Sequence, residues 1–541
     1  MSEKWGMKVY LKGVALLTVA ALFVKVLSMV YRVPFQNLVG DHGFYIYQQV
    51  YPFVALFVTW TSSGIAVAIS KMLADLDESN QRAERSAMLR IILHFLTLLS
   101  MVCFGILYFG APLFAHLMGD LKLAGLLKIG AFVVFCMPLL AIYKGLFQST
   151  GIMQPVAYAQ VVEQTVRVAV ILGGTWIIMS TTGSLYGAGK IAVSGTVVGE
   201  FAGILLLAWY MKKHSSLGAK YNRDVKTNLA KWPIIKKLMV LSISVSMSSL
   251  VLLVFQLVDS FTIYSALKKL GLSSLQAMET KGIYDRGLPL VQVGLVVASS
   301  LSLAIVPLVA HASKRDDGRN ADRFIQLTYR TSLLFGIAAT VGLILVMPNI
   351  NTTLFENADL SNVLSVFVIQ IIWLSLIMTL TAMLQGLDRL KIPALLLVVG
   401  IIAKMLCNKL FILKFGIVGA AWAGNLGLFM TTMGLISYFK RVKNIHLATT
   451  RFYSGAALAT LAMVLFVLLF TMFVEPIIFP SLQGRVRALI LCVLKAGIGA
   501  FVFLTMLAKL NVLSVRDWYL LPLGRRMASY QLWINRKNKQ K

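Results

Sequence analysis

Two cations stand out in the apolar stretch from Val24 to Phe53, which begins in one hydrophobic segment, passes a Gly-Asp turn and enters the next. Lys25 and Arg32 are seven residues apart, which is about two helical turns, so both side chains fall on one face of a helix. A charge inside the membrane is costly and needs water, a counter-ion or a partner. The spacing therefore indicates a hydrated or anion-filled interior beside this helix.

Other charged residues of the apolar segments are candidate cavity or gating groups. Glu163 and Arg167 are spaced i, i+4 and can pair along one helix face, as an internal ion pair, a cavity wall or a proton-linked switch. Asp285 and Arg286 are either ordinary loop charges or a cation at the mouth of a cavity, with its acidic neighbour. Asp259 could pair with Arg286 or with a lysine.

Four of the remaining intramembrane cations are expected to have no direct role in function. Lys144, Lys190 and Arg330 lie near segment ends, where long side chains can extend to the interface. Lys495 is also assigned a structural role. Lys404 has no matching acid in the sequence pattern, and the same holds for its neighbour Lys409. A stripe of small residues in one segment predicts close helix packing: Gly195, Gly199 and Gly203.

No catalytic or metal-binding constellation is visible. The sequence contains no HExxH or Gly-x-Ser-x-Gly motif and no acidic cluster in an outer loop. The four cysteines are far apart inside apolar segments, which indicates buried thiols rather than disulfides or metal ligands. The sequence therefore shows no site for catalysis, and neither an enzyme activity nor a cofactor is expected.

Composition identifies the bilayer as the solvent of this chain. The 541 residues are 58% hydrophobic and only 13% charged, and the mean hydropathy is +0.80, which no soluble domain of this length matches. In a soluble protein the formal net charge of +30 would suggest nucleic acid. Here positively charged cytoplasmic loops and anionic membrane lipids explain it, so no nucleic-acid partner is expected.

Fourteen segments are long enough to span a membrane as helices. This predicts an all-α polytopic membrane protein, and the loops are too short for a soluble domain. The predicted spans cover residues 9–33, 44–70, 90–111, 124–147, 155–179, 185–210, 238–264, 286–312, 324–347, 361–386, 392–413, 416–438, 452–474 and 487–508. Lys and Arg concentrate in the 211–237 loop and the C-terminal tail, so both termini are expected in the cytoplasm.

The chain also repeats itself at an offset of 237 residues. Pro52 then falls on Pro289 and Gln148 on Gln385, and Ser62 and Ser63 fall on two further serines, 299 and 300. Six spans per copy give both copies the same orientation, as a parallel repeat about an axis along the membrane normal. The expected organisation is an N-terminal lobe at 1–211, a cytoplasmic linker at 212–237, a C-terminal lobe at 238–440, and two extra spans with a basic tail at 441–541.

The spans, the repeat and the cations of span one together resemble the MurJ-type lipid II flippases of the multidrug/oligosaccharidyl-lipid/polysaccharide (MOP) exporter superfamily. Within this family the sequence looks most like the Gram-positive branch called YtgP, near SpoVB. The resemblance is carried by RVPFQNLVGDHGFYIYQQVYPF from Arg32 to Phe53, YDRGLPLVQVG from Tyr284 to Gly294 and AIVPL from Ala304 to Leu308.

The resemblance implies a MATE-like MOP fold with two six-helix lobes around a central cavity, and transport by alternating access. The implied cargo is lipid II, the undecaprenyl-diphosphate-linked precursor of peptidoglycan, flipped in the bacterial cell membrane for cell wall biogenesis and cell shape. Membrane lipids and the cell-wall synthesis machinery are the implied partners. The membrane potential or a coupling ion would drive the cycle, and the identity of that ion is open.

The family's functional cations carry over at two positions. Lys25 in V-K-V-L-S matches the span-one arginine of the family's S-R-V-L-G pattern, and Arg286 matches the span-eight arginine before the proline. The paired arginines of the family's span two are Leu56 and Phe57 here. Arg32 is therefore expected to supply the missing charge, so Lys25, Arg32 and Arg286 form the expected substrate site.

Other readings of the sequence remain open. A flippase for another polyprenyl-linked polysaccharide would have the same features. A drug or cation antiporter of the same superfamily would need acidic residues in its cavity to bind a cationic substrate, whereas here basic residues dominate. A membrane glycosyltransferase would need acidic catalytic residues in outer loops, and a scaffold of the division machinery would have no use for intramembrane cations.

Overall fold

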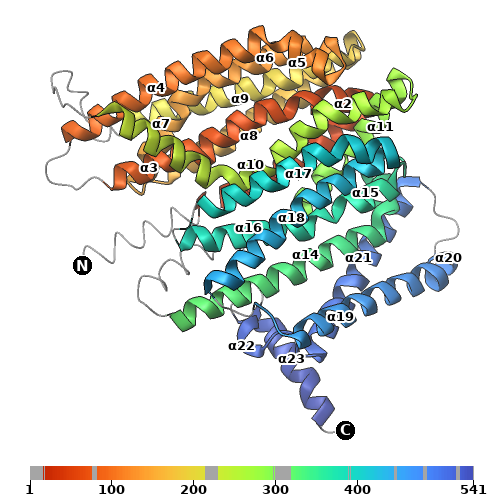
Figure 1. The fold of residues 1–541 in the computed structure, drawn as a ribbon. Coiled ribbons are helices and arrows are strands. Elements are labelled where there is room, and N and C mark those ends of the chain that lie inside the picture. The colour runs from red at the N-terminus through yellow and green to blue at the C-terminus, as the bar shows by residue number, and fades with distance from the viewer. Residues whose placement is uncertain are drawn as a thin grey trace. The chain divides into compact units, whose positions relative to one another are not determined.

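The structure is a computed structural model, and it is helical throughout the parts of the chain that it describes (Figure 1). The described residues are 16–17, 19–75, 82–213, 230–296, 298, 318–387, 389, 391–443, 447–478, 484–519 and 524–539. This confirms an all-α membrane protein. The chain forms two compact units, one of Met1–Asp285 with Lys404–Ala420 (unit 1) and one of Arg286–Ala403 with Ala421–Lys541 (unit 2).

Eleven helical stretches among the described residues are long and apolar enough to cross a membrane. The first, Val19–Ala74, runs through two of the predicted spans. Helix α18 (Ile417–Lys443) coincides with the predicted span 416–438 but is not one of the eleven. More than half of the predicted span 286–312, including its AIVPL motif at Ala304 to Leu308, lies outside the described residues. The count of fourteen therefore stays a prediction.

A break at Gly40 separates the two predicted spans within Val19–Ala74. Gly40 has φ +67° inside α2 (Arg32–Thr59), a conformation that glycine adopts without steric cost. The side-chain amide of Gln36 donates to the carboxylate of Asp41 across this break. The structure therefore confirms the turn that the Gly-Asp pair predicted.

Unit 1 is built mainly from long antiparallel helices. After α2 come a π-helical turn, η1 (Trp60–Ile65), and α3 (Ala66–Ala74). The following elements are α4 (Arg82–Phe109), α5 (Ala111–Met118), η2 (Leu121–Leu123), α6 (Ala124–Ala131), η3 (Phe132–Cys136), α7 (Met137–Ser149), α8 (Gln154–Thr181), α9 (Leu185–Lys213), α10 (Lys231–Lys269) and α11 (Ser274–Asp285). Helix α2 contacts α8, α9, α10 and α11, so it lies at the centre of this unit.

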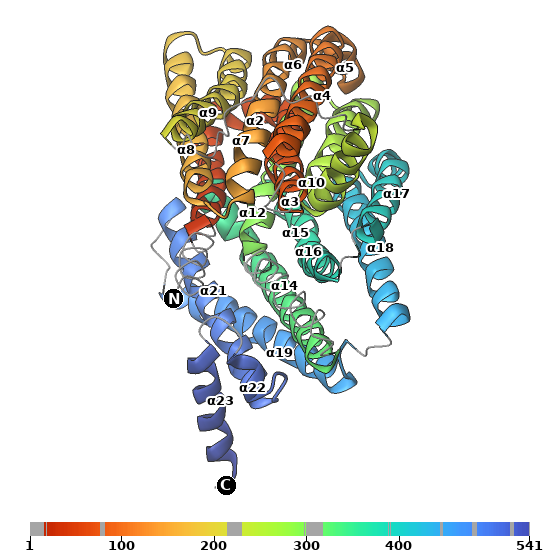
Figure 2. The same ribbon diagram turned by 90° about the vertical axis from the view of Figure 1, so that its left-hand side faces the viewer.

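The predicted stripe of small residues is a helix contact. Helices α8 and α9 lie side by side and make the most extensive helix contact of the structure (Figure 2). A Cβ added at Gly199 would collide with the backbone oxygen of Glu163, and one at Gly203 with the Glu163 side chain. The missing side chains therefore let α8 and α9 approach closely, as the spacing predicted.

Unit 2 contains the C-terminal helices. They are α12 (Gly287–Gly294), α14 (Gly318–Phe355), α15 (Ser361–Val368), α16 (Gln370–Gly386), the first part of α17 (Lys391–Phe415), most of α18, α19 (Thr450–Leu469), η4 (Phe470–Val474), α20 (Glu475–Ile478), α21 (Gly484–Lys509), α22 (Val515–Trp518) and α23 (Gly524–Lys539). Helices α14, α19 and α21 pack around a core that includes Met463, Phe503 and Trp518.

Candidate functional site

Arg32 is a buried cation at the start of α2, with 1% of its surface exposed. Its guanidinium carbon lies 4.8 Å from the centre of the Tyr51 ring, which the break at Gly40 brings back beside it. Within the described part of the chain, the Nε and Nη1 atoms of Arg32 have no hydrogen-bond partner. Because a guanidinium stays charged and its buried donors are costly to leave unpaired, Arg32 can bind an anionic acceptor.

A second arginine faces the same aromatic ring from α8. The guanidinium carbon of Arg167 lies 5.6 Å from the centre of the Tyr51 ring, and its Nη2 donates to the Tyr47 hydroxyl at 3.4 Å. Its Nε has no partner among the described residues. The Tyr47 hydroxyl is also hydrogen-bonded to that of Tyr31, at 2.9 Å. The fold therefore gathers residues from three sequence segments around one ring.

This arrangement has the chemistry of an anion site. Two guanidiniums present planar forks of N–H donors, which match the oxygens of phosphate groups. The tyrosine hydroxyls can donate or accept beside them, and the ring attracts both cations through its negative face. We call Arg32, Arg167, Tyr31, Tyr47 and Tyr51 the arginine–tyrosine cluster.

The predicted pair between Glu163 and Arg167 is wrong. Glu163 instead binds Lys144 of α7, whose Nζ lies 2.9 Å from the carboxylate and 3.0 Å from the Ser62 hydroxyl. Lys144 is completely buried, so the expectation that it extends to the interface is also wrong. The reason is that Arg167 contacts tyrosines of α2, while the Glu163 carboxylate lies against α9 and within reach of α7.

Asp259 has lysine and amide partners from α17. Its carboxylate accepts from Lys404 Nζ at 2.7 Å and from the Asn408 amide at 3.1 Å. Asn408 also donates to the Thr262 hydroxyl at 2.6 Å. The expectation that Lys404 lacks a matching acid is therefore wrong, and of the partners left open for Asp259 the structure selects a lysine. The partner is 145 residues away, so no local spacing could reveal it.

Asp285 is part of a buried pair in α11. Lys281 Nζ lies 2.7 Å and 2.6 Å from its two carboxylate oxygens. Burial raises the pKa of Asp285, although the Lys281 ammonium opposes this shift. Asp285 is therefore neither a loop charge nor a partner of its neighbour Arg286.

Arg286 is held inside unit 2. It is 1% exposed, and its Nη1 donates to the side-chain oxygens of Asn351 at 3.0 Å and Asn357 at 2.6 Å. Its guanidinium carbon lies 5.1 Å from the centre of the Phe355 ring. Lys25, by contrast, is exposed and forms no ion pair with any residue that the structure describes. That Lys25, Arg32 and Arg286 meet at one substrate stays a prediction.

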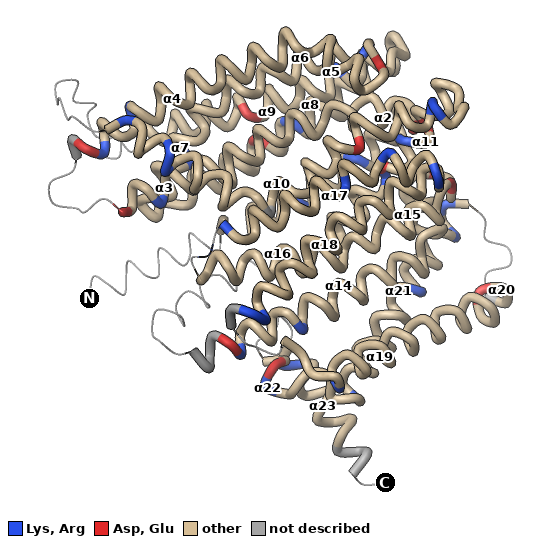
Figure 3. The backbone as a smooth tube through the Cα atoms, viewed as in Figure 1, with Lys and Arg blue, Asp and Glu red and all other residues tan. Residues whose placement is uncertain are grey.

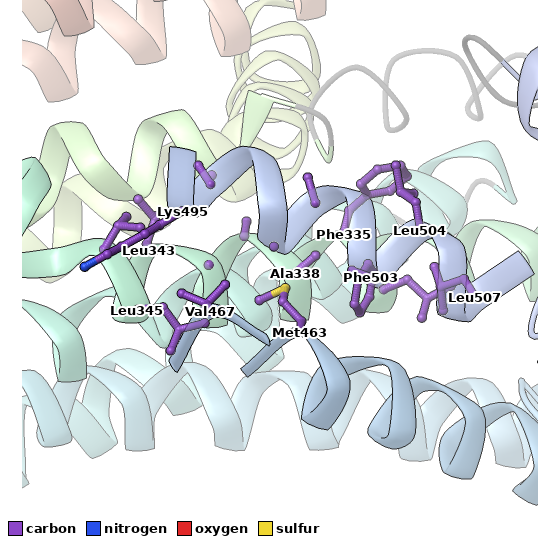
Figure 4. A pocket seen from close by; sticks show the side chains of 18 of the residues that line it. Phe335, Ala338, Leu343, Leu345, Met463, Val467, Lys495, Phe503, Leu504 and Leu507 are labelled. Carbon is purple, nitrogen blue, oxygen red and sulfur yellow. The ribbon is translucent and has the colours of Figure 1, made fainter. Parts of the chain in front are cut away.

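Unit 2 also contains an apolar cavity of about 410 Å³ between α14, α19 and α21 (Figure 4). Its lining includes Phe335, Met463 and Phe503, with Lys495 as a charged member. Lys495 Nζ lies 2.8 Å from the Glu475 carboxylate, which fits its structural assignment. Over the described ranges, no group of three or more His, Cys, Asp or Glu residues could hold a metal ion.

The fold is similar to that of a known transporter. A solved structure described as "Lipid II flippase MurJ, inward closed conformation" aligns with a TM-score of 0.67, covering 91% of this chain and 98% of that chain at 16% sequence identity. This likeness establishes a MOP-type fold. The class of protein is therefore a multi-pass membrane protein with the MOP-exporter architecture.

Sequence comparison identifies the family. The chain matches the family described as "Polysaccharide biosynthesis protein" over residues 10–313, and it belongs to that family. The "Uncharacterized membrane protein YabM" of Bacillus subtilis (strain 168) is 34% identical over 525 residues, which cover 96% of each chain. The "Lipid II flippase MurJ" of the same organism is 26% identical over 436 residues, 77% of this chain and 80% of that one. The chain is therefore a member of the polysaccharide-biosynthesis-protein family with the fold of a MOP exporter.

Sequence reasoning found both arginines of the arginine–tyrosine cluster but not the tyrosines or the shared ring. Tyr47 and Tyr51 stand in the quoted motif, one turn apart on α2. Tyrosines are common in membrane helices, so no specific signal for their role was present in the sequence. Lys144 was missed as a partner because 19 residues and a helix junction separate it from Glu163.

Proposed function

We propose that this protein flips lipid II, or a closely related polyprenyl-diphosphate sugar, from the inner to the outer leaflet of the bacterial cell membrane. The single observation that carries this proposal is the arginine–tyrosine cluster, in which Arg32 and Arg167 share the Tyr51 ring and keep unpaired donors. A diphosphate that links a lipid to a sugar carries about two negative charges, which two guanidiniums match. The family and the named flippase among its relatives support the same class of cargo.

The physics of the cargo explains why such a site is needed. The sugar-peptide head would lose its hydrogen bonds to water in hydrocarbon, at several kcal/mol per unsatisfied polar group. A hydrated interior lined by cations removes most of this barrier. A gap between helices lets the polyprenyl tail stay in lipid while the head crosses.

The proposal includes the architecture that the sequence predicted. It has fourteen spans, two six-span lobes at 1–211 and 238–440, the linker 212–237, two extra spans in 441–541, and both termini in the cytoplasm. In this arrangement Lys25 and Arg286 join the arginine–tyrosine cluster at the substrate during alternating access. Arg167 and Arg32 together supply the charge that Leu56 and Phe57 do not provide in span two.

Two alternatives differ in cargo. Flippases for other polyprenyl-linked polysaccharides handle the same diphosphate, so only the choice of sugar separates them from this proposal. A drug antiporter would use carboxylates to bind a cation. Here Glu163 and Asp259 are neutralised by Lys144 and Lys404, so these acids support that alternative poorly.

The test is lipid II translocation by the purified full chain in vesicles. Removing Arg32 or Arg167 deletes charge-assisted contacts of roughly 1.5–3 kcal/mol each, or about ten- to a hundred-fold in affinity. We expect Arg32→Ala and Arg167→Ala each to slow translocation by about ten- to a hundred-fold. Arg485→Ala is the matched control, because Arg485 is a half-exposed arginine paired with Glu356 in unit 2. Wild-type vesicles that leave lipid II in its original leaflet would refute the proposal, as would alanine variants with undiminished rates.

A further inference from the structure

Glu200 is a buried acid that has no partner among the described residues. It lies in the middle of α9 with 5% of its surface exposed. Among the residues that the structure describes, nothing forms a hydrogen bond or ion pair with its carboxyl group. It stands between Gly199 and Gly203, two glycines of α9 at which an added Cβ would collide with Glu163 of α8. In Figure 3, charged positions interrupt α8 and α9 within otherwise uncharged helices.

The titratable groups that interact with Glu200 lie on three of the elements packed against α9, namely α8, α7 and η3. Glu163 and Arg167 of α8 and Lys144 of α7 interact with it electrostatically, and so does Cys136 of η3. Lys144 is already bound by Glu163 at 2.9 Å. One ammonium therefore interacts with two carboxyl groups, and it forms its ion pair with Glu163. A buried carboxylate without its own counter-ion is strongly disfavoured relative to the neutral acid.

This carboxyl pair is connected to the arginine–tyrosine cluster. Arg167 is one helical turn from Glu163 on α8, interacts with Glu200, and reaches Tyr47 and the Tyr51 ring on its other side. Of the two cations that interact with Glu200, Lys144 is already paired with Glu163, and an anion bound at Arg167 would offset the charge of the other. Binding of an anion should therefore increase the proton affinity of Glu200.

The charges can be counted for both protonation states. Arg32, Arg167 and Lys144 are three cations, and Glu163 is one anion. With Glu200 neutral, the two clusters together carry two positive charges, which a diphosphate of about two negative charges neutralises. With Glu200 ionised, the occupied site would keep an uncompensated buried negative charge.

We propose that Glu200 takes up one proton when a diphosphate occupies the arginine–tyrosine cluster, so that anion and proton bind together. The inference rests on the proposed function and adds a coupling ion to it. The proton comes from water and forms an O–H bond with the Glu200 carboxylate, and no other bond changes. By reciprocity, protonation of Glu200 strengthens anion binding by the same factor.

The sign of the pH dependence follows. At low pH Glu200 is already neutral and the anion binds tightly. As the pH rises through the range where the carboxyl group of the free protein titrates, affinity falls by about tenfold per pH unit for a one-proton linkage. Once Glu200 is ionised even with the anion bound, the affinity no longer depends on pH.

The test is calorimetric binding of purified lipid II to the full-length protein in detergent. Its diphosphate links lipid to sugar and does not itself titrate near neutral pH. Titrations in two buffers with different ionisation enthalpies give the number of protons taken up per lipid II bound. We expect uptake of up to one proton by the wild type, none by Glu200→Gln, and uptake again by Glu200→Asp. Glu200→Gln should also bind lipid II with an affinity that changes less than twofold between pH 6 and 9.

The outcomes separate this inference from the proposed function. Lipid II binding without proton uptake in the wild type would overturn the role of Glu200 and leave the flippase proposal intact. Proton uptake that persists in Glu200→Gln would overturn it as well, because another group would then titrate. A wild-type protein that does not bind lipid II at all would overturn both. The melting temperature of each variant confirms that it is folded.

Discussion

Glu163 shows how a single residue obtains its partner from the fold rather than from its own helix. Its i+4 neighbour is Arg167, yet its carboxylate binds Lys144 of another helix. An exposed i, i+4 pair contributes only about 0.2–0.5 kcal/mol, so the local spacing is easily overridden. Removing one member of a buried pair costs roughly 3–5 kcal/mol, because the other charge is left uncompensated.

This residue-scale contact gives a double-variant prediction. We expect Glu163→Gln to lower the melting temperature in detergent, because it leaves the Lys144 ammonium buried without its carboxylate. Adding Lys144→Met should recover most of the loss. Adding Arg167→Leu instead should not. If the Arg167 double variant were the one that recovered, the pairing with Lys144 would be refuted.

A second residue-scale prediction concerns Lys25 and Arg286. When the resident flippase is depleted, Lys25→Ala and Arg286→Ala should fail to support growth although both reach the membrane in normal amount. Lys25→Arg should retain much of the activity, because the charge survives. Growth would be scored at low expression, with membrane levels measured by immunoblot. Full complementation by both alanine variants would exclude these residues from the transport site.

At the scale of elements, the contact of α8 with α9 depends on glycines. Gly199 and Gly203 have no space for a Cβ against Glu163, whereas Gly173 on α8 has no heavy atom within 4 Å of that position. We expect Gly199→Ala and Gly203→Ala to destabilise the protein by about 1–3 kcal/mol through overpacking. Gly173→Ala, the matched control, should be neutral or slightly stabilising. Equal melting temperatures for all three variants would contradict the packing argument.

Element positions were largely predictable, and local irregularities were not. Hydrophobic length located most spans, and the Gly-Asp pair located the turn at Gly40. The π-helical turn Trp60–Ile65 had no signal in the sequence. At its Gly64 an added Cβ would meet the Ser242 carbonyl oxygen of α10, so this turn fits a contact with a helix nearly 180 residues further along.

The candidate site was predictable only in part, for a related physical reason. A charged residue in an apolar segment is conspicuous in the sequence because its burial in a membrane is costly. Arg32, Arg167, Asp259 and Glu163 were therefore all predicted as candidate charges. Their partners were not, because Lys144 and Lys404 come from other helices and an ion pair depends on position in space. Aromatic neighbours such as Tyr51 are common in membrane proteins and give no specific signal.

At the scale of the whole molecule, the orientation in the membrane can be tested at two helix ends. The concentration of lysines and arginines predicts that the C-terminal end of α9 lies in the cytoplasm. In a cysteine-less variant of intact cells, Lys212→Cys should therefore resist an impermeant thiol reagent, and Thr182→Cys, at the opposite end of the α8–α9 pair, should react. Both positions are exposed, so access is not limited by packing. The reverse labelling pattern would show that the predicted topology is wrong and that the opposite orientation holds.

The shared ring of Tyr51 has a consequence for hydration. Each guanidinium that lies against the ring has one face without water before any ligand arrives. An incoming anion must therefore lose its own hydration water, but it displaces less water from the protein than it would at a fully hydrated guanidinium. Such a site discriminates by the strength of anion hydration, so it should favour a diphosphate whose charge is spread over many oxygens and whose ends are esterified. Compact, strongly hydrated ions such as free phosphate should compete poorly, although they are far more abundant in the cell.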